Sequence, residues 1–240
     1  MTMEHTVKSY ESDLKQLNAL IVEMGNLTHL QLDIALSAVD QRDNFKAEHV
    51  IATDVQVDER EHLIDQFAVR LLALRQPVAG DLRQVVAALK ISSHLERIAD
   101  YAANIAKRAL ALNQVPPVPP IHNISRMGKI TQAMILGVMD AYITLDDKRT
   151  IKIWKQDAEV DQMYASLIRE LLTYMIEDPR SIGPCTHILF MAKNIERIGD
   201  HVTNIAEVVH FITHGKPFNE PRPKVEEDAI NALILNRPSK

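Results

Sequence analysis

The chain has 240 residues, of which 46% are hydrophobic and 25% are charged, and its formal net charge is −5. A chain of this size and composition can bury a substantial core, as one domain or as two small ones. The negative charge argues against general nucleic-acid binding, which needs a positive surface, and we expect no nucleic-acid partner. The single cysteine, Cys185, excludes an internal disulfide.

The N-terminus is polar and acidic and lacks the pattern of a signal peptide. Apolar runs such as AMILGVM are far shorter than the roughly 20 residues that span a bilayer. We therefore expect a cytoplasmic protein that meets a membrane only through partner proteins.

Breaks rich in proline, glycine or acidic residues divide the chain into long segments whose apolar spacing is typical of helices. Few aromatic residues and no alternating Val/Ile/Thr runs leave little basis for a sheet. We predict an all-α fold with six main helices. They lie near residues 6–40, 43–75, 81–112, 122–145, 149–177 and 184–213.

The second half of the chain repeats the first. Gly25 and Thr28 correspond to Gly128 and Thr131 at a spacing of 103 residues, and the spacing becomes 100 beyond the QPVAGD turn. Residues 91–110 and 191–210 share seven identities in twenty positions. We therefore predict two tandem three-helix bundles joined by a stiff proline-rich linker. The expected boundaries are 1–115 for the first repeat, 116–121 for the linker, 122–215 for the second repeat and 216–240 for a C-terminal extension.

Acidic and amide residues form one stripe on the third helix of each repeat. Successive helical residues are about 100° apart, so this stripe lies nearly opposite the apolar stripe and points to an outer or lateral face. The second helix of each repeat carries an acidic pair at i and i+4, and a hairpin turn between the two helices brings both sets level. The stripe residues are Glu96, Asp100, Asn104, Glu196, Asp200 and Asn204, and the pairs are Asp54 with Asp58 and Asp157 with Asp161.

Crowded carboxylates repel one another unless a cation joins them, and oxygen ligands suit several multivalent ions. Acids at i and i+4 are also common on a solvated face, where Arg97 and Arg197 could pair with them. The occurrence of the set in both repeats favours metal, and we predict all ten residues as metal ligands. The oxygen donors alone do not choose among iron, zinc, manganese, magnesium and calcium.

Three segments resemble the PhoU family of phosphate-uptake regulators, and the resemblance covers residues from about 6 to 215. They are ALRQPVAGDLR (73–83), ALKISSHLERIADYAANIAK (88–107) and AKNIERIGDHVTNIAEVVHFITHG (192–215). The first motif departs from the family pattern at Ala99, where glycine is usual, and at His94, where an acid is common. His94 lies toward the core side of its helix, and we do not expect it to be a ligand.

The resemblance implies a six-helix, non-enzymatic regulator that represses the phosphate-starvation response and phosphate uptake. It implies multinuclear metal clusters, of iron or zinc, at the E/D-x-x-x-D motifs, and a homodimer. It also implies two partners, because family members couple the phosphate-specific ABC transporter to a sensor histidine kinase.

Two other classes of function stay open from the residues alone. One is a metal-dependent hydrolase or oxidase that uses the acidic residues, and the other is a metal-free helical scaffold. Glu59 and His62 form a Glu-x-x-His pair, but ferritin-like sites need two such pairs, and the repeat lacks the second. The ten histidines are scattered, and we identify no metalloprotease pair and no nucleophile with its base. We therefore favour the regulator.

Overall fold

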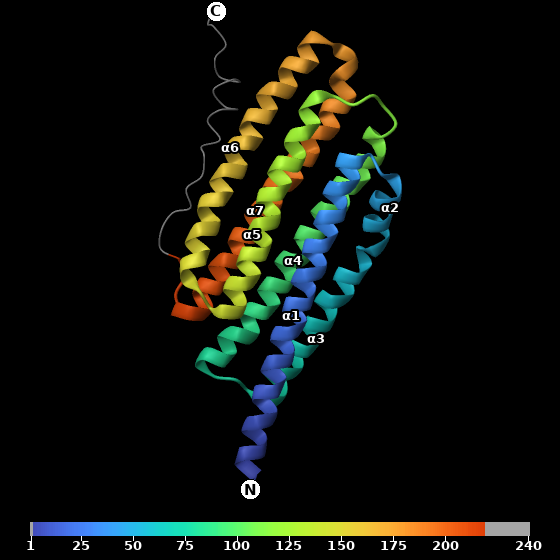
Figure 1. Ribbon diagram of the computed structural model, residues 1–240. Coiled ribbons are helices and arrows are strands. Elements are labelled where there is room, and N and C mark those ends of the chain that lie inside the picture. Colours follow the sequence, from blue (N-terminus) through green and yellow to red (C-terminus); the bar gives the residue numbers. More distant parts are fainter. Residues whose placement is uncertain (1, 219–240) are drawn as a thin grey trace, which may run out of the picture.

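The computed structural model describes residues 2–218, and all regular structure in this range is helical (Figure 1). The α-helices are α1 (Thr2–Gln41), α2 (Asn44–Thr53), α3 (Val55–Arg75), α4 (Ala79–Leu112), α5 (His122–Thr144), α6 (Asp147–Glu177) and α7 (Ile182–His214). Short 3-10 turns cover Pro119–Ile121 and Pro179–Ser181. The predicted all-α fold is confirmed. From position 219 onward, the expected C-terminal extension lies outside the described residues.

The predicted helix at 43–75 is divided into α2 and α3 at Asp54. At this break Gln31 of α1 donates through its Nε2 to the Asp54 carboxylate at 2.8 Å and to the Val50 carbonyl at 3.4 Å. The Thr53 hydroxyl donates to the same carbonyl at 3.4 Å. In an unbroken helix the Val50 carbonyl would instead accept from the Asp54 N–H. The repeat counterpart of Gln31 is Met134, which has no such donor, and α6 runs unbroken.

Each repeat forms a three-helix bundle, the first from α1, α2–α3 and α4 and the second from α5, α6 and α7 (Figure 1). α4 packs along α7 more extensively than any other two described elements pack together, and α1 also contacts α5. The buried apolar residues of both repeats form one continuous hydrophobic core. We propose that the repeats meet in the sequence at the linker 116–121, between α4 and α5.

The contact between α1 and α5 follows the symmetry of the repeat. A β-carbon on Gly25 would lie 2.6 Å from Met139 Cε, and a β-carbon on Gly128 would lie 2.5 Å from Leu36 Cδ1. The two pairs are related by the same spacing of 103 residues that the sequence predicts. Each glycine therefore lets the large side chain of the other repeat pack against its helix backbone.

Candidate functional site

Four predicted carboxylates meet where α3 packs along α4, and we name them the first acidic face. They are Asp54, Asp58, Glu96 and Asp100. Burial, followed by the nearby charge of Asp100, raises the pKa of Glu96 to about 7. Burial also raises the pKa of Asp54, and the charges of Asp100 and Asp58 add to that rise. Carboxylates shift one another in this way only at short range, so the structure brings these four residues together.

Replacing Glu96 with glutamine should remove part of the pH dependence of stability in metal-free protein. The pKa of Glu96 rises from 4.5 to about 7 on folding, so within this window the folded state holds a proton that the unfolded state releases. The stabilisation is therefore present below the window and is lost as the pH rises through it. Because Glu96 keeps some contact with solvent, we expect the free energy of unfolding to fall by about 1 kcal/mol across this window in the wild-type protein.

Urea unfolding at about pH 5 and about pH 8, with a chelator present, measures this loss. The variant Glu59→Gln changes an exposed glutamate of α3. Its free energy of unfolding should vary with pH as that of the wild type does. If the free energy of unfolding of Glu96→Gln changed with pH as much as that of the wild type, the prediction would be contradicted.

The second acidic face lies where α6 packs along α7. Its members are Asp157, Asp161, Glu196 and Asp200. Burial raises the pKa of Glu196, whereas Lys193, whose Nζ lies 2.7 Å from Glu196 Oε1, lowers it. The charges of Asp200 and Asp161 also raise the pKa of Glu196. The second repeat therefore gathers its acids as the first does, and each face has a basic partner. In the first face, Arg97 lies 3.4 Å from Glu96 Oε2 and 3.1 Å from Asp100 Oδ2.

The two faces differ at one position of the motif, where Gly199 corresponds to Ala99. A β-carbon on Gly199 would lie 2.6 Å from Asp157 Oδ1, so the glycine gives that carboxylate room against the α7 backbone. Asp157 is accordingly only 5% exposed, whereas its counterpart Asp54 is half-buried. The departure of Ala99 from the family pattern thus coincides with a more open first face.

Asn104 and Asn204 are half-buried, one helical turn beyond the aspartates of their motifs. His94 does not point at the first acidic face, because its Nδ1 lies 3.1 Å from Nδ1 of His201 across the contact between α4 and α7. The asparagines therefore lie beside the acidic faces, while the two histidines lie between the repeats.

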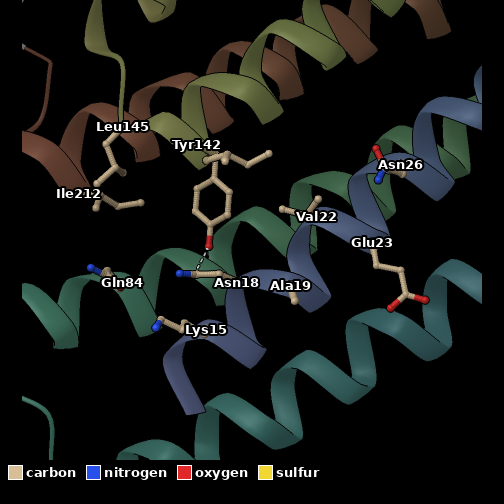
Figure 2. Close-up of a pocket in the computed structure, with 11 residues that line it drawn as sticks. Lys15, Asn18, Ala19, Val22, Glu23, Asn26, Gln84, Tyr142, Leu145 and Ile212 are labelled. Atoms are coloured by element: carbon tan, nitrogen blue, oxygen red, sulfur yellow. Dashed lines mark hydrogen bonds between the residues drawn. The ribbon is translucent and has the colours of Figure 1, made fainter. Parts of the chain in front are cut away.

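A separate groove of about 660 Å³ lies between the repeats, lined by residues of α1, α4, α5 and α7 (Figure 2). Tyr142 of α5 reaches into it and donates a hydrogen bond to Asn18 Oδ1 of α1 at 2.6 Å. Among its lining residues Glu23 is the one carboxylate. The groove therefore lacks the set of acids that the two faces carry.

A third group of metal-ligand side chains was not predicted from the sequence. It consists of Asp147, His210 and His214, whose ligand atoms all lie within 4.8 Å of one another. The spacing His-x-x-x-His is a visible signal, because it places two imidazoles on one face of a helix. The aspartate lies 63 residues before His210 in the chain, and only the tertiary structure brings it to the histidines.

Two tandem helical bundles that share a core and carry matched acidic faces define an all-α repeat protein. No helix among residues 2–218 is long and apolar enough to cross a membrane. The sequence pattern of the PhoU domain matches this chain twice, at residues 21–109 and 124–209. The chain belongs to the PhoU family, and the resemblance inferred from its motifs is confirmed.

Relatives in this family share most of their length with the chain. A phosphate-specific transport system accessory protein PhoU homolog of Caulobacter vibrioides is 49% identical over 224 residues, which is 93% of this chain and 97% of that relative. The PhoU accessory protein of Escherichia coli is 34% identical over 236 residues, covering 98% and 96% of the two chains. The crystal structure of PhoU from Pseudomonas aeruginosa matches with a TM-score of 0.84 and 35% identity, over 86% of this chain and 100% of that one.

The relatives from Caulobacter vibrioides and Escherichia coli are named as accessory proteins of phosphate-specific transport, and the family is non-enzymatic. The prediction that this chain is not an enzyme is therefore confirmed by its family.

Proposed function

We propose that this chain is a cytoplasmic accessory protein of phosphate-specific transport that represses the phosphate-starvation response when phosphate is plentiful. In this role it couples a phosphate-specific ABC transporter to a sensor histidine kinase. The observation that carries the proposal is the match of both repeats to the PhoU domain, together with 49% identity to a phosphate-transport accessory protein over 93% of the chain.

We further propose that each acidic face binds a multinuclear metal cluster. Carboxylates whose pKa values are raised by burial and by neighbouring acids are stabilised when a cation adds positive charge beside them. The donors fit hard or borderline ions, with the asparagines supplying neutral oxygens. Iron and zinc follow from the family resemblance, and magnesium, manganese and calcium also fit these donors. The proposed ligands are Asp54, Asp58, Glu96, Asp100 and Asn104 on one face and Asp157, Asp161, Glu196, Asp200 and Asn204 on the other.

Exposed apolar side chains at the hairpin turns support contacts with proteins. Leu74 and Val78 flank the turn between α3 and α4, and they are 68% and 75% exposed. Ile176 lies at the corresponding turn between α6 and α7 and is 81% exposed. Apolar side chains left in water at matching places favour an interaction surface, and we propose that these turns take part in partner binding or in a homodimer.

Reversing the charge of one central acid on each face tests the proposed function. The double variant Asp100→Lys and Asp200→Lys should derepress phosphatase expression in high phosphate, because each lysine repels the proposed cations and alters the charge of both faces. Phosphatase activity and the level of the protein are measured in cells in which the variant is the sole copy.

The matched control reverses two exposed acids outside the faces, Glu48 and Glu159, and should leave repression intact. Unchanged repression in the Asp100→Lys, Asp200→Lys variant at normal protein level would remove the acidic faces from the mechanism.

A further inference from the structure

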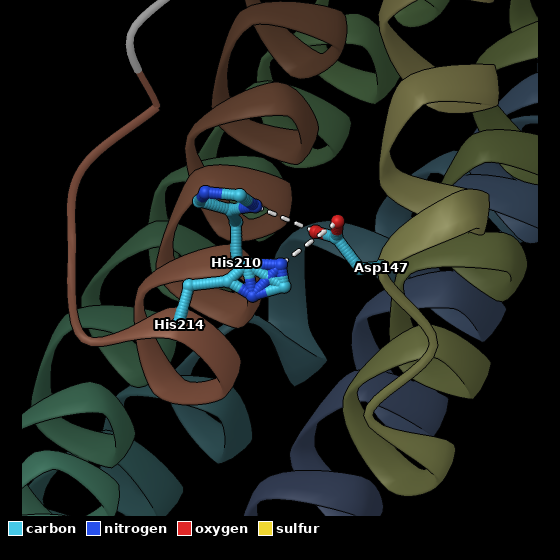
Figure 3. A group of neighbouring side chains, drawn as sticks. All are labelled: Asp147, His210 and His214. Carbon is cyan, nitrogen blue, oxygen red and sulfur yellow. Dashed lines mark hydrogen bonds and ion pairs between the residues drawn. The ribbon is translucent and has the colours of Figure 1, made fainter.

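Three side chains with metal-ligand atoms meet where α7 ends beside the start of α6 (Figure 3). His210 and His214 are one helical turn apart, so both rings leave the same face of α7. Asp147, the first residue of α6, lies opposite them. Its Oδ1 is 2.6 Å from Nδ1 of His210, and its Oδ2 is 3.3 Å from Nε2 of His214.

This donor set differs in chemistry from the acidic faces. Two imidazole nitrogens and one carboxylate oxygen suit Zn²⁺, and three protein ligands leave a fourth position for water. Ligand atoms around a tetrahedral zinc ion lie roughly 3.3 Å apart, and the two distances from Asp147 to the imidazole nitrogens, 2.6 and 3.3 Å, are already of this order. His214 also lies in the last turn of α7, where the carbonyl dipoles favour a cation.

Aromatic packing holds the site in shape. Gly215 ends α7 with a left-handed backbone (φ 67°), and the chain then brings Phe218 onto the His210 ring at a centroid distance of 4.4 Å. Trp154 packs on Phe218 at 4.2 Å. Packing of this kind fixes the orientation of a ligand ring and shields one side of the site from water.

The cluster is a feature of the second repeat alone. The corresponding positions of the first repeat carry Asn44, Leu110 and Gln114, a set without an imidazole or a carboxylate. We propose that Asp147, His210 and His214 bind a single divalent transition-metal ion, Zn²⁺ in the first instance, at one site per chain. The proposal is independent of the acidic faces and of the proposed regulatory function.

Modification of histidines by diethyl pyrocarbonate, mapped by mass spectrometry on the chelator-treated full chain, tests the site. Titration with Zn²⁺ at neutral pH should lower the modification of His210 and His214 by at least about tenfold at saturation. The exposed His49 and His122 should react as before. Mg²⁺, which prefers oxygen ligands, should give no protection. In Asp147→Asn the Zn²⁺ concentration that gives half-maximal protection should rise by at least about tenfold.

Equal reactivity of His210 and His214 with and without saturating Zn²⁺, in protein shown to be folded by circular dichroism, would overturn the proposal. The proposal would also be overturned if Asp147→Asn were protected at the same Zn²⁺ concentration as the wild type, because the carboxylate would then not be a ligand. Either result would leave the regulatory function untouched, since that function is tested at Asp100 and Asp200.

Discussion

Replacing Gly128 with leucine should lower the free energy of unfolding by about 3 kcal/mol. Gly128 is buried where α5 packs on α1, and even a β-carbon there would lie 2.5 Å from Leu36 Cδ1. A leucine fits only if Leu36 leaves its position or the two helices move apart. Either change disturbs a close-packed core, which outweighs the better helix propensity of leucine. Urea unfolding followed by circular dichroism measures the effect.

Gly183 provides the matched control, because a β-carbon there would meet no atom within 4 Å. Gly183→Leu should change stability by less than about 0.5 kcal/mol. Leu36→Ala alone is destabilising, yet it should partly rescue Gly128→Leu, since the vacated volume admits the new side chain. If the losses of unfolding free energy in Gly128→Leu and Leu36→Ala simply added in the double variant, the contact between these two positions would be contradicted.

Replacing Gly199 with alanine should destabilise the protein by about 2 kcal/mol, although alanine is the better helix former. The new methyl group would lie 2.6 Å from Asp157 Oδ1. Asp157 is only 5% exposed, so its carboxylate has little freedom to move, and displacing a buried charged group from its partners is costly. Urea unfolding of chelator-treated protein measures the change.

Gly137→Ala makes the same substitution within a helix where there is room. The nearest atoms to its β-carbon belong to Ile153, at 3.9 Å, so we expect a gain of about 0.5 to 1 kcal/mol from the lower backbone entropy of the unfolded chain. A comparable gain in Gly199→Ala would show that Asp157 is not held against α7.

The helices and the repeat were predictable because long apolar periodicity and a fixed spacing are properties of the sequence itself. Gly25 and Gly128, for example, occur at matching positions of the repeat and also make matching contacts. The division at Asp54 was not predicted, and one of the side chains bonded there, Gln31, comes from another helix. Local sequence cannot show which distant side chain competes for a helical carbonyl.

The positions of the acids were predicted better than their burial. Helical rotation places Glu96 and Glu196 opposite the core, yet only 17% and 15% of their side chains are exposed. The reason is that α4 and α7 each pack against several other helices, so few directions around them face open solvent. The cluster at His210 was missed for a related reason, because its aspartate comes from the far end of the preceding helix.

The single core that α4 and α7 share means that the repeat is a unit of sequence but not a unit of folding. A chain that ended at the linker would leave the buried apolar residues on the α7-facing side of α4 in water, and an isolated second repeat would expose the matching side of α7. An ancestor with one repeat would therefore have needed a second copy of itself to cover that surface. Around the shared core the present repeats still differ at individual positions, as Gln31 with its counterpart Met134 and His210 with its counterpart Leu110 show.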